Sequence, residues 1–341
     1  MREEKLEASE LVIAKIIRVF FKEKRLPVSW DKRYHEIIFE KSLQEILRKI
    51  AYEMPLKCAI RSQSELHILT CSKDLFMAIA ACKSFLLFYN NISIVFHGDE
   101  SLTYKHADIL KKAIKNAKVI SYQDAKNRLR SYSRVSMLRD RAADRFELPF
   151  GYDRKRRAWA QKIFDFYVFS ESKKVIVMDS DVLFVKFPEE IINWIESNSE
   201  IAFYSVPQFP NLKVEAEEFD SIFPQIDPLI KFNGGLYGYC KDQLSLEMIE
   251  DVVEKLIIRE SYPVLGDECF WRAIYSLIPS APLPFEFYPL ITEFYRKEKL
   301  MPDMEKAKYF HFILKHRGGI YQKVARDFFV NLESSYKNKV V

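Results

Sequence analysis

Short apolar runs alternate with amphipathic segments after residue 65, and this alternation restricts the fold more than any other feature of the sequence. LHILTC (66–71), ISIVFHGD (92–99) and KVISY (118–122) are typical of buried strands. Segments 74–89 and 106–116, which lie between them, have helical periodicity. This order predicts an α/β fold, with a mainly parallel sheet and crossover helices. In such sheets ligands bind beyond the carboxyl ends of the strands.

The first 60 residues have a different pattern, which is typical of helices. Apolar residues recur at helical spacing in 13–20 and again in 37–50. We therefore divide the chain into a helical N-terminal extension, residues 1–60, and an α/β domain, residues 61–330. Either the extension packs on the domain, or the basic amphipathic stretch 11–25 contacts a membrane or a partner.

Charge and composition exclude several classes of protein. The chain has 341 residues, of which 48% are hydrophobic and 30% charged, as in an ordinary globular protein. The formal net charge of +5 suits an anionic ligand such as a nucleotide diphosphate. This excess is too small, and too little clustered with aromatic residues, to indicate nucleic-acid binding.

The cysteines and the N-terminal sequence bear on where the protein works. Five cysteines, without a C-x-x-C pair, do not suggest a disulfide framework or a zinc site. The first residues lack the basic start and cleavage site of a signal peptide, and segment 75–89 is too short to span a bilayer. We expect a cytoplasmic protein, with weak peripheral contact at the inner face of a membrane as a further possibility.

Residues 126–157 are rich in arginine and are expected to be irregular and mostly solvent-exposed, with one or two arginines able to reach a phosphate. A helix is expected over 158–170.

The segment with the clearest chemistry is VIVMDSD, residues 175–181. An apolar run typical of a central parallel strand ends in Asp179-Ser180-Asp181. Side chains at i and i+2 of an extended chain project from the same face, so both carboxylates lie together at the end of the strand. Buried without a partner they would be costly, whereas a divalent cation would stabilise them and still bind phosphate oxygens. The alternative is a turn with two solvated aspartates.

VIVMDSDVLFVKFPEEI (175–191) resembles the D-x-D region of A-type (GT-A fold) nucleotide-diphospho-sugar glycosyltransferases, and is similar to family 8-like bacterial members. Further segments resemble the family in the same order: LHILTCSKDLFMAIAACKSFL (66–86), VFHGDESLT (95–103), KFNGGLYGY (231–239), LGDECFWRAIY (265–275) and YFHFILKHR (309–317). The resemblance covers about residues 66–320. It implies a Rossmann-like, mainly parallel sheet with flanking helices.

The same resemblance implies a metal site for Mn²⁺ or Mg²⁺. Asp181 is the first choice of ligand, and Asp179 shares the ion or contacts the ribose or sugar of the donor. His311 is the expected third ligand, with His316 as the alternative. The retaining subfamily has the pattern H-x-x-G-x-x-K, from which this chain departs, since Leu314 follows His311 where the glycine is expected. The subfamily and the stereochemical outcome therefore stay open.

Other positions are expected to bind the donor. Thr70, Lys73 and Asp99 follow strands at which the family holds the nucleotide, and Lys315 and Arg317 could neutralise the departing diphosphate. Each of these two cations could equally be a solvent-facing charge.

Two further motifs concern the sugar and the acceptor. Asn233, Gly234 and Gly235 would allow close backbone approach and bind sugar hydroxyls, or would form a bulge in an edge strand. Asp267, preferred over Glu268, would accept the acceptor's proton in an inverting enzyme, or bind the sugar in a retaining one. Asp267 could also simply cap a helix.

Together these features predict a metal-dependent, hexosyltransferase-like enzyme. It would move a sugar from a nucleotide-diphosphate sugar, with a UDP-sugar as the leading candidate, to a hydroxyl of a glycan, lipid-linked or protein acceptor in polysaccharide or glycoconjugate synthesis. One alternative is a sugar nucleotidyltransferase, although a G-x-G-T-R-like loop is missing from the sequence. The other is a catalytically degenerate transferase that acts as a binding module.

Overall fold

A computed structural model of the protein describes residues 28–145, 153–207, 231–258, 267–291, 303, 305–312 and 319–337. The chain forms two compact units, one made of residues 1–53 and 313–341 and the other of residues 54–312.

The smaller unit contains helices α2 (Val28–Glu53) and α13 (Gly319–Lys337). Leu43, Leu47 and Tyr321 are buried in it, and Gln322 Nε2 donates a hydrogen bond of 2.7 Å to Ser42 Oγ. Residues 1–27, with the amphipathic and basic stretches on which the membrane hypothesis depends, lie outside the described residues. Among the helices that are described, none has the length and apolar character needed to cross a membrane.

The larger unit is built on a seven-stranded sheet of order β10-β8-β9-β6-β2-β3-β5. Strands β2, β3, β5 and β6 are parallel to one another, β9 is antiparallel to β6 and to β8, and β10 is parallel to β8. The bounds are β2 Ser64–Thr70, β3 Ser93–Gly98, β5 Lys118–Ile120, β6 Lys174–Met178, β8 Ala202–Ser205, β9 Asn233–Cys240 and β10 Ser280–Pro282. The predicted α/β fold with a mainly parallel sheet is confirmed.

Two small sheets accompany it. One pairs β1 with β4, and the other has the order β11-β12-β7. Their bounds are β1 Leu56–Lys57, β4 Ile114–Lys115, β7 Val182–Phe184, β11 Leu290–Ile291 and β12 Tyr309–Phe312.

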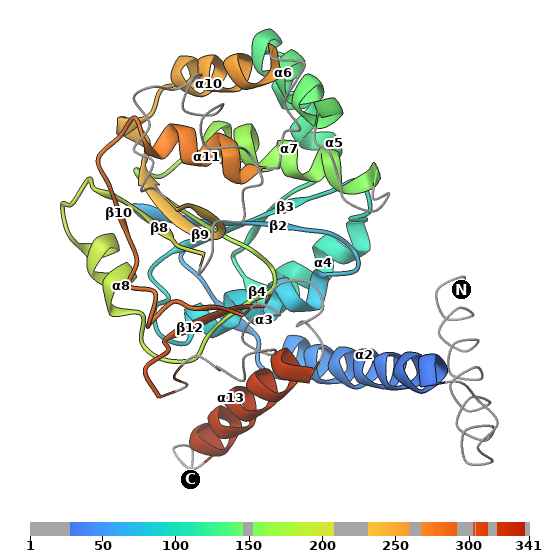
Figure 1. Cartoon of the computed structure of the whole chain (residues 1–341). Coiled ribbons are helices and arrows are strands. Elements are labelled where there is room, and N and C mark those ends of the chain that lie inside the picture. Colours follow the sequence, from blue (N-terminus) through green and yellow to red (C-terminus); the bar gives the residue numbers. More distant parts are fainter. Residues whose placement is uncertain are drawn as a thin grey trace. The chain divides into compact units, whose positions relative to one another are not determined.

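Helices cover both faces of the large sheet: Figure 1 shows α6, α7, α10 and α11 on one side and α3 on the other. Val175 and Val177 of β6 belong to the core formed with the first group, and Ile176 and Met178, which alternate with them, are buried as well. A continuous apolar run is what a strand covered on both faces requires. The helices of this unit are α3 Leu75–Leu86, α4 Tyr104–Ala113, α5 Tyr122–Leu129, α6 Ser133–Arg145, α7 Asp153–Val168, α8 Glu189–Glu196, the 3₁₀ turn η1 Lys241–Gln243, α10 Leu246–Ile258 and α11 Asp267–Tyr275.

The expectation that residues 126–157 are irregular was wrong, because α5, α6 and the start of α7 occupy most of this region. Val135, Leu138 and Ala142 recur at helical spacing and are buried against the sheet's core. Arg139 is also buried, since it pairs with Asp165 across a distance of 2.9 Å. The number of arginines hid an apolar stripe that periodicity alone would have revealed.

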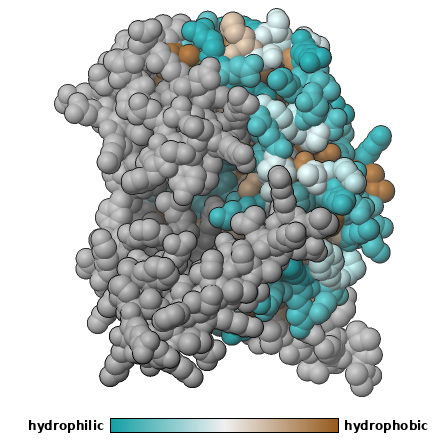
Figure 2. Space-filling view, turned by 90° about the vertical axis from the view of Figure 1, so that its right-hand side faces the viewer, coloured by the Kyte–Doolittle hydropathy of each residue, from teal (hydrophilic) through white to brown (hydrophobic). Residues whose placement is uncertain are grey.

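The surface of the described part carries few large hydrophobic side chains. On the face shown in Figure 2, the coloured residues are mainly hydrophilic, and hydrophobic ones form small separate groups.

Candidate active site

The order of the strands reverses between β2 and β6. From β2 the chain proceeds through β3 to β5 on one side, and it then returns to form β6 on the other side of β2. Crevices at such reversals are where open α/β sheets bind ligands. Thr70 ends β2 and Asp179 follows the last residue of β6, so both lie at this point.

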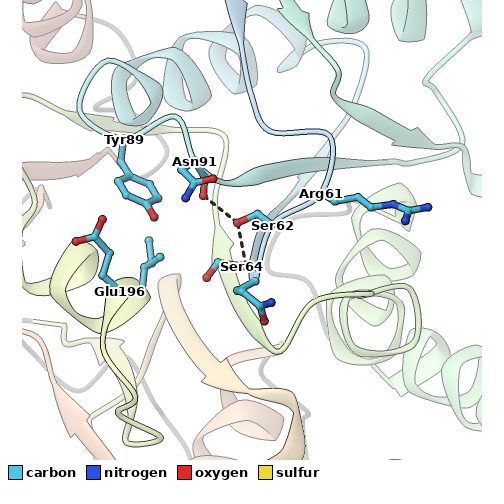
Figure 3. Close-up of a pocket in the computed structure, with 8 residues that line it drawn as sticks. Arg61, Ser62, Ser64, Tyr89, Asn91 and Glu196 are labelled. Atoms are coloured by element: carbon cyan, nitrogen blue, oxygen red, sulfur yellow. Dashed lines mark hydrogen bonds between the residues drawn. The ribbon is translucent and has the colours of Figure 1, made fainter.

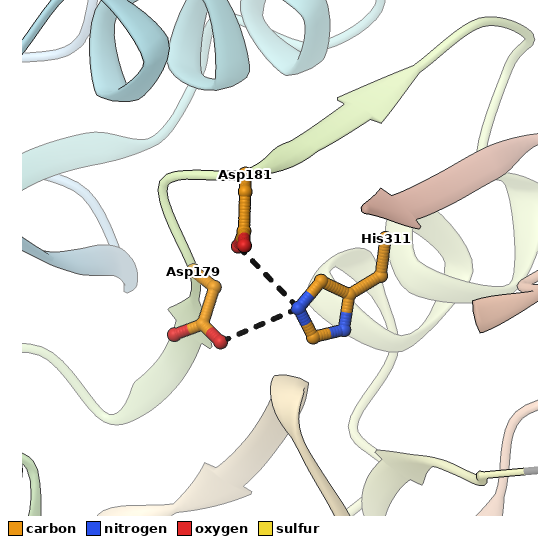
Figure 4. A group of neighbouring side chains, drawn as sticks. All are labelled: Asp179, Asp181 and His311. Atoms are coloured by element: carbon orange, nitrogen blue, oxygen red, sulfur yellow. Dashed lines mark ion pairs between the residues drawn. The ribbon is translucent and has the colours of Figure 1, made fainter. Parts of the chain in front are cut away.

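Asp179 and Asp181 flank the turn between β6 and β7, and β12 brings His311 to them. β12 pairs antiparallel with β7, with His311 opposite Val182, and Phe312 N donates to Asp181 O at 2.9 Å. One ligand atom from each of the three side chains lies within 4.8 Å of the others (Figure 4). His311 Nε2 is 3.5 Å from Asp179 Oδ2 and 3.4 Å from Asp181 Oδ1. We call these three residues the strand-end cluster.

Asn233 fixes the orientation of the His311 ring. Gly235 N–H donates to Asn233 Oδ1 at 3.0 Å, and Asn233 Nδ2 donates to Glu268 Oε1 at 3.0 Å. Since Asn233 Oδ1 accepts, His311 Nδ1, 3.1 Å away, must donate to it. The lone pair of a neutral imidazole is then on Nε2, which faces both carboxylates. A second hydrogen bond that fixes the tautomer is typical of histidine ligands of metals.

Gly235 is required by this packing. A Cβ atom at this position would lie 2.2 Å from His311 Nδ1 and 2.9 Å from Asn233 Oδ1. The carbonyl of Gly235 also accepts hydrogen bonds from Asp179 N at 3.0 Å and from Tyr309 Oη at 3.3 Å. The glycine therefore lets β9 approach both parts of the cluster closely.

Lys162 of α7 is a site residue that the sequence did not reveal. Its Nζ donates to Asp179 Oδ1 at 2.8 Å and to Gly234 O at 3.3 Å, and its side chain is buried. The indole Nε1 of Trp271 donates to Lys162 O at 3.2 Å and holds this part of the helix against α11.

A signal for Lys162 was present in the sequence. Gln161, Lys162 and Asp165 are three polar residues in the otherwise apolar segment AQKIFDF, and all three are buried. Polar residues in a helix that is apolar on its other faces need buried partners, and a strand end rich in carboxylates supplies one.

Burial lowers the pKa of His311, but the carboxylates of Asp181 and Asp179 outweigh burial, and the net pKa lies above its ordinary value. Two carboxylates thus face one imidazole, and Lys162 pairs with one of them, Asp179. Two carboxylates and one imidazole, converging with acceptor atoms facing one another, fit a divalent cation such as Mn²⁺ or Mg²⁺.

The residues expected to hold the nucleotide lie at neighbouring strand ends. Asp99 N donates to Thr70 O at 3.1 Å, and Thr70 is buried. Asp99 Oδ1 accepts from Ser101 N and Oγ at 2.8 and 2.6 Å, and Ser101 Oγ in turn accepts from Ser72 N at 2.9 Å. Lys73 is exposed in the same loop. These bonds join the two loops, and the nucleotide-binding roles stay predictions.

Of the five remaining predicted residues, the structure describes the side chain of only one. Glu268 lies beside the strand-end cluster, where its Oε1 accepts from Gly234 N at 3.0 Å as well as from Asn233. Asp267 begins α11, but its side chain lies outside the described residues. Lys315 and Arg317 also lie outside them, as does the alternative ligand His316.

No family model and no curated protein matches the sequence. Solved structures do match it. The WbbM bifunctional glycosyltransferase has a TM-score of 0.54 at 14% identity over 79% of this chain, which spans 50% of that protein. The galactosyltransferase LgtC, in complex with donor and acceptor sugar analogs, has a TM-score of 0.52 at 10% identity over 77% of this chain and 96% of LgtC. GlyE of Streptococcus pneumoniae TIGR4 has a TM-score of 0.50 at 11% identity over 82% of this chain and 64% of GlyE. The chain has the GT-A fold of these glycosyltransferases.

Proposed function

We propose that this protein is a metal-dependent glycosyltransferase that uses a nucleotide-diphosphate sugar, with a UDP-sugar as the leading donor. The observation that supports this most directly is the convergence of Asp179, Asp181 and His311 within 4.8 Å at the reversal point of a GT-A sheet. A fold alone does not define an activity, but this cluster supplies the chemistry that the activity needs at the expected edge.

In this proposal the three side chains bind one divalent ion. Such an ion would neutralise the diphosphate of the donor and stabilise it as a leaving group. Lys162 holds Asp179 and carries a positive charge into the same region. Thr70, Lys73 and Asp99 are proposed to hold the nucleotide.

Glu268 and Asp267 are assigned different tasks. One oxygen of Glu268 accepts two hydrogen bonds, from Asn233 Nδ2 and Gly234 N. Because both of its hydrogen bonds go to the start of β9, Glu268 suits the positioning of Asn233. Asp267 is therefore the proposed catalytic carboxylate, either as the base or as a ligand of the sugar. Lys315 and Arg317, which are outside the described residues, are proposed to neutralise the leaving group.

The catalytic domain is proposed to be residues 61–330, as delimited from the sequence. A hydroxyl of a glycan, a lipid-linked sugar or a protein is the proposed acceptor.

Calorimetry with UDP, GDP, CMP and dTDP, each with Mn²⁺ and with EDTA, tests the proposal. We expect tight binding of one nucleotide diphosphate that depends on the metal, and slow release of that nucleotide from the matching sugar donor. Equal affinity in EDTA would contradict the metal site. Release of pyrophosphate from a nucleoside triphosphate and a sugar phosphate would indicate the nucleotidyltransferase. Metal-dependent binding without any turnover, with or without acceptor, would favour the binding module.

A further inference from the structure

A polar cavity lies at the amino-terminal edge of the large sheet, away from the strand-end cluster. It has a volume of about 530 Å³, and Arg61, Ser62, Ser64, Tyr89, Asn91 and Glu196 line it (Figure 3). Ser64 begins β2 and Thr70 ends it, so the length of the strand, about 20 Å, separates the cavity from the candidate active site. Its volume is within the range of about 300–1,000 Å³ for small-molecule sites.

The charges around the cavity favour a neutral ligand. The Arg61 side chain points away from the cavity, and Glu196 lies at its rim (Figure 3). An exposed carboxylate at the rim disfavours phosphate or another anion, although water and salt screen it. Lys174, which is opposite Ser64 in the sheet, donates to the carbonyls of Trp194 and Ile195 and does not line the cavity.

The lining offers hydrogen bonds and one flat apolar surface. The Ser64 side chain is buried beneath the lining, and its Oγ, which has no hydrogen-bond partner among the residues that the structure describes, is closed to solvent. Tyr89 presents its ring and hydroxyl on the opposite side. Burial and Glu196 raise the pKa of Tyr89, so its hydroxyl stays protonated at neutral pH and can donate. Ile195 completes the wall.

The rim is held in place by bonds to the sheet. Ser62 Oγ donates to Asn91 O at 2.8 Å and accepts from Ser64 N at 3.3 Å, while Ser172 Oγ donates to Ser62 O at 2.8 Å. Lys174 N donates to Gln63 O at 3.0 Å. A cavity whose lining is ordered before binding loses little conformational entropy when a ligand enters.

We propose that this cavity is a second carbohydrate-binding site, which holds a neutral mono- or disaccharide unit of a glycan. A sugar ring has an apolar face that suits the ring of Tyr89, and hydroxyls that suit Asn91 and the hydroxyl of Tyr89. The choice of a glycan over other neutral polyols rests on the proposed function. A glycan held there and at the active site would gain affinity through effective concentration.

Saturation-transfer NMR and calorimetry, performed in EDTA without nucleotide, test the site independently of transfer activity. The probes are lactose, maltose and cellobiose, with glucose 6-phosphate and glucosamine as charged comparators. We expect at least one neutral disaccharide to bind with a Kd on the order of 1 mM. Tyr89→Ala and Asn91→Ala are each expected to weaken this binding at least about tenfold. Tyr104→Ala, at an exposed tyrosine outside the cavity, is the matched control and should leave it unchanged.

Ser64→Ala is a second control, beneath the lining. Removing a buried hydroxyl that lacks a partner among the described residues should raise the Tm, and sugar binding should stay unchanged because this hydroxyl is closed to solvent. Failure of all three disaccharides to bind, tighter binding of a charged comparator, or equal binding by Tyr89→Ala and wild type would overturn the proposal. Metal-dependent nucleotide binding is expected to be normal in every variant, so that its loss would bear on the proposed function and not on this site.

Discussion

Two groups of histidine and carboxylate lie in the α/β unit, and their surroundings differ in a way that separates a ligand site from a structural network. One is the strand-end cluster, Asp179, Asp181 and His311. The other, which we call the interior cluster, is Glu65, His67 and His97. Both combine imidazole with carboxylate at short distances.

The interior cluster is closed. Glu65 Oε2 accepts from the backbone N–H groups of Glu171 at 2.7 Å and Ser172 at 3.2 Å. His67 Nδ1 lies 2.9 Å from His97 Nε2, and the three side chains are almost fully buried. His97 Nδ1 has no hydrogen-bond partner among the described residues, but it is buried, and none of the three side chains is exposed enough for an ion to enter.

The strand-end cluster differs in its ratio of carboxylates to imidazole and in its exposure. Two carboxylates share one imidazole, and the side chain of Asp179 is 28% exposed. Carboxylates raise the pKa of His311, whereas burial lowers the pKa of His67 and His97. Proximity of histidine to carboxylate therefore indicates a ligand site only where acceptors remain in excess and one of them reaches solvent.

The largest expected effect tests this difference directly. Asp181→Ala should reduce sugar transfer by about 10³-fold or more, because it removes a proposed ligand that stabilises the departing charge. Tm in EDTA should change by only a few degrees, since the loss of attraction to His311 and the relief of repulsion from Asp179 offset each other. Donor consumption and thermal unfolding provide the two measurements, and calorimetry with Mn²⁺ shows whether the ion is lost.

Glu65→Gln is the matched change in the interior cluster. It should lower the free energy of unfolding by about 3 kcal/mol, because the N–H groups of Glu171 and Ser172 lose a charged acceptor, and it should leave Mn²⁺ binding by the folded protein unchanged. Near-normal turnover by Asp181→Ala, or loss of Mn²⁺ affinity in Glu65→Gln, would reverse the roles that we assign to the two clusters.

A second, smaller effect concerns the support of the strand-end cluster. Gly235→Ala would place a methyl group against His311 Nδ1, so the ring must move. A displacement near 1 Å at a reacting centre costs about 10²-fold in rate. We expect turnover and Mn²⁺ affinity to fall together, as measured by donor consumption and calorimetry. Gly238→Ala, which would meet Phe203 instead, is the control for a β9 glycine, and it should affect stability without a specific loss of Mn²⁺ affinity.

The sequence predicted the fold because its apolar periods are local. The run 175–178, with the flanking helices, indicates a central parallel strand without knowledge of any other contact. The same run places Asp179 and Asp181 at a strand end. These elements agree with one another, and the structure confirms the α/β fold that they predict.

Local apolar periodicity could not predict the contacts between distant segments. Lys162 reaches Asp179 because α7 crosses the end of β6, and Asn233 orients His311 because β9 and β12 meet there. These pairings follow from the order of the strands and the register of β12 with β7, which the pattern of neither segment specifies. The helix over residues 133–145 was missed for another reason, since its arginines obscured an apolar stripe.

The third prediction concerns the interior cluster and acid. His67 and His97 have pKa values below 6.5 in the folded protein, so the unfolded chain takes up protons first as the pH falls below about 6.5. Stability should decrease there by up to about 1.4 kcal/mol per pH unit for each proton. Hydrogen bonds outweigh the burial of Glu65 and lower its pKa to about 2. Stability should therefore continue to decrease as the pH falls below 4.5.

Urea unfolding between pH 7 and pH 4 measures this slope. His97→Gln removes one titrating group and should flatten the profile between pH 6.5 and 5. An unchanged slope in this variant would mean that other residues cause the acid sensitivity. Protonation of the interior cluster would then cost less free energy in the folded protein than its burial implies.

The smallest expected effect separates charge from position at Lys162. Lys162→Met keeps the buried aliphatic stem but removes the group that joins Asp179 Oδ1 to Gly234 O. Loss of this link should reduce turnover about tenfold, as for residues that orient a metal ligand. Mn²⁺ affinity should hold or rise, because the neighbouring carboxylates lose a competing cation. Lys173→Met, at an exposed lysine that pairs with Glu200 and Asp242, is the control and should change neither quantity. A parallel fall in turnover and Mn²⁺ affinity would mean that Lys162 holds the metal ligands in place. No change in either quantity would mean that its ion pair with Asp179 is structural only, like the contacts of the interior cluster.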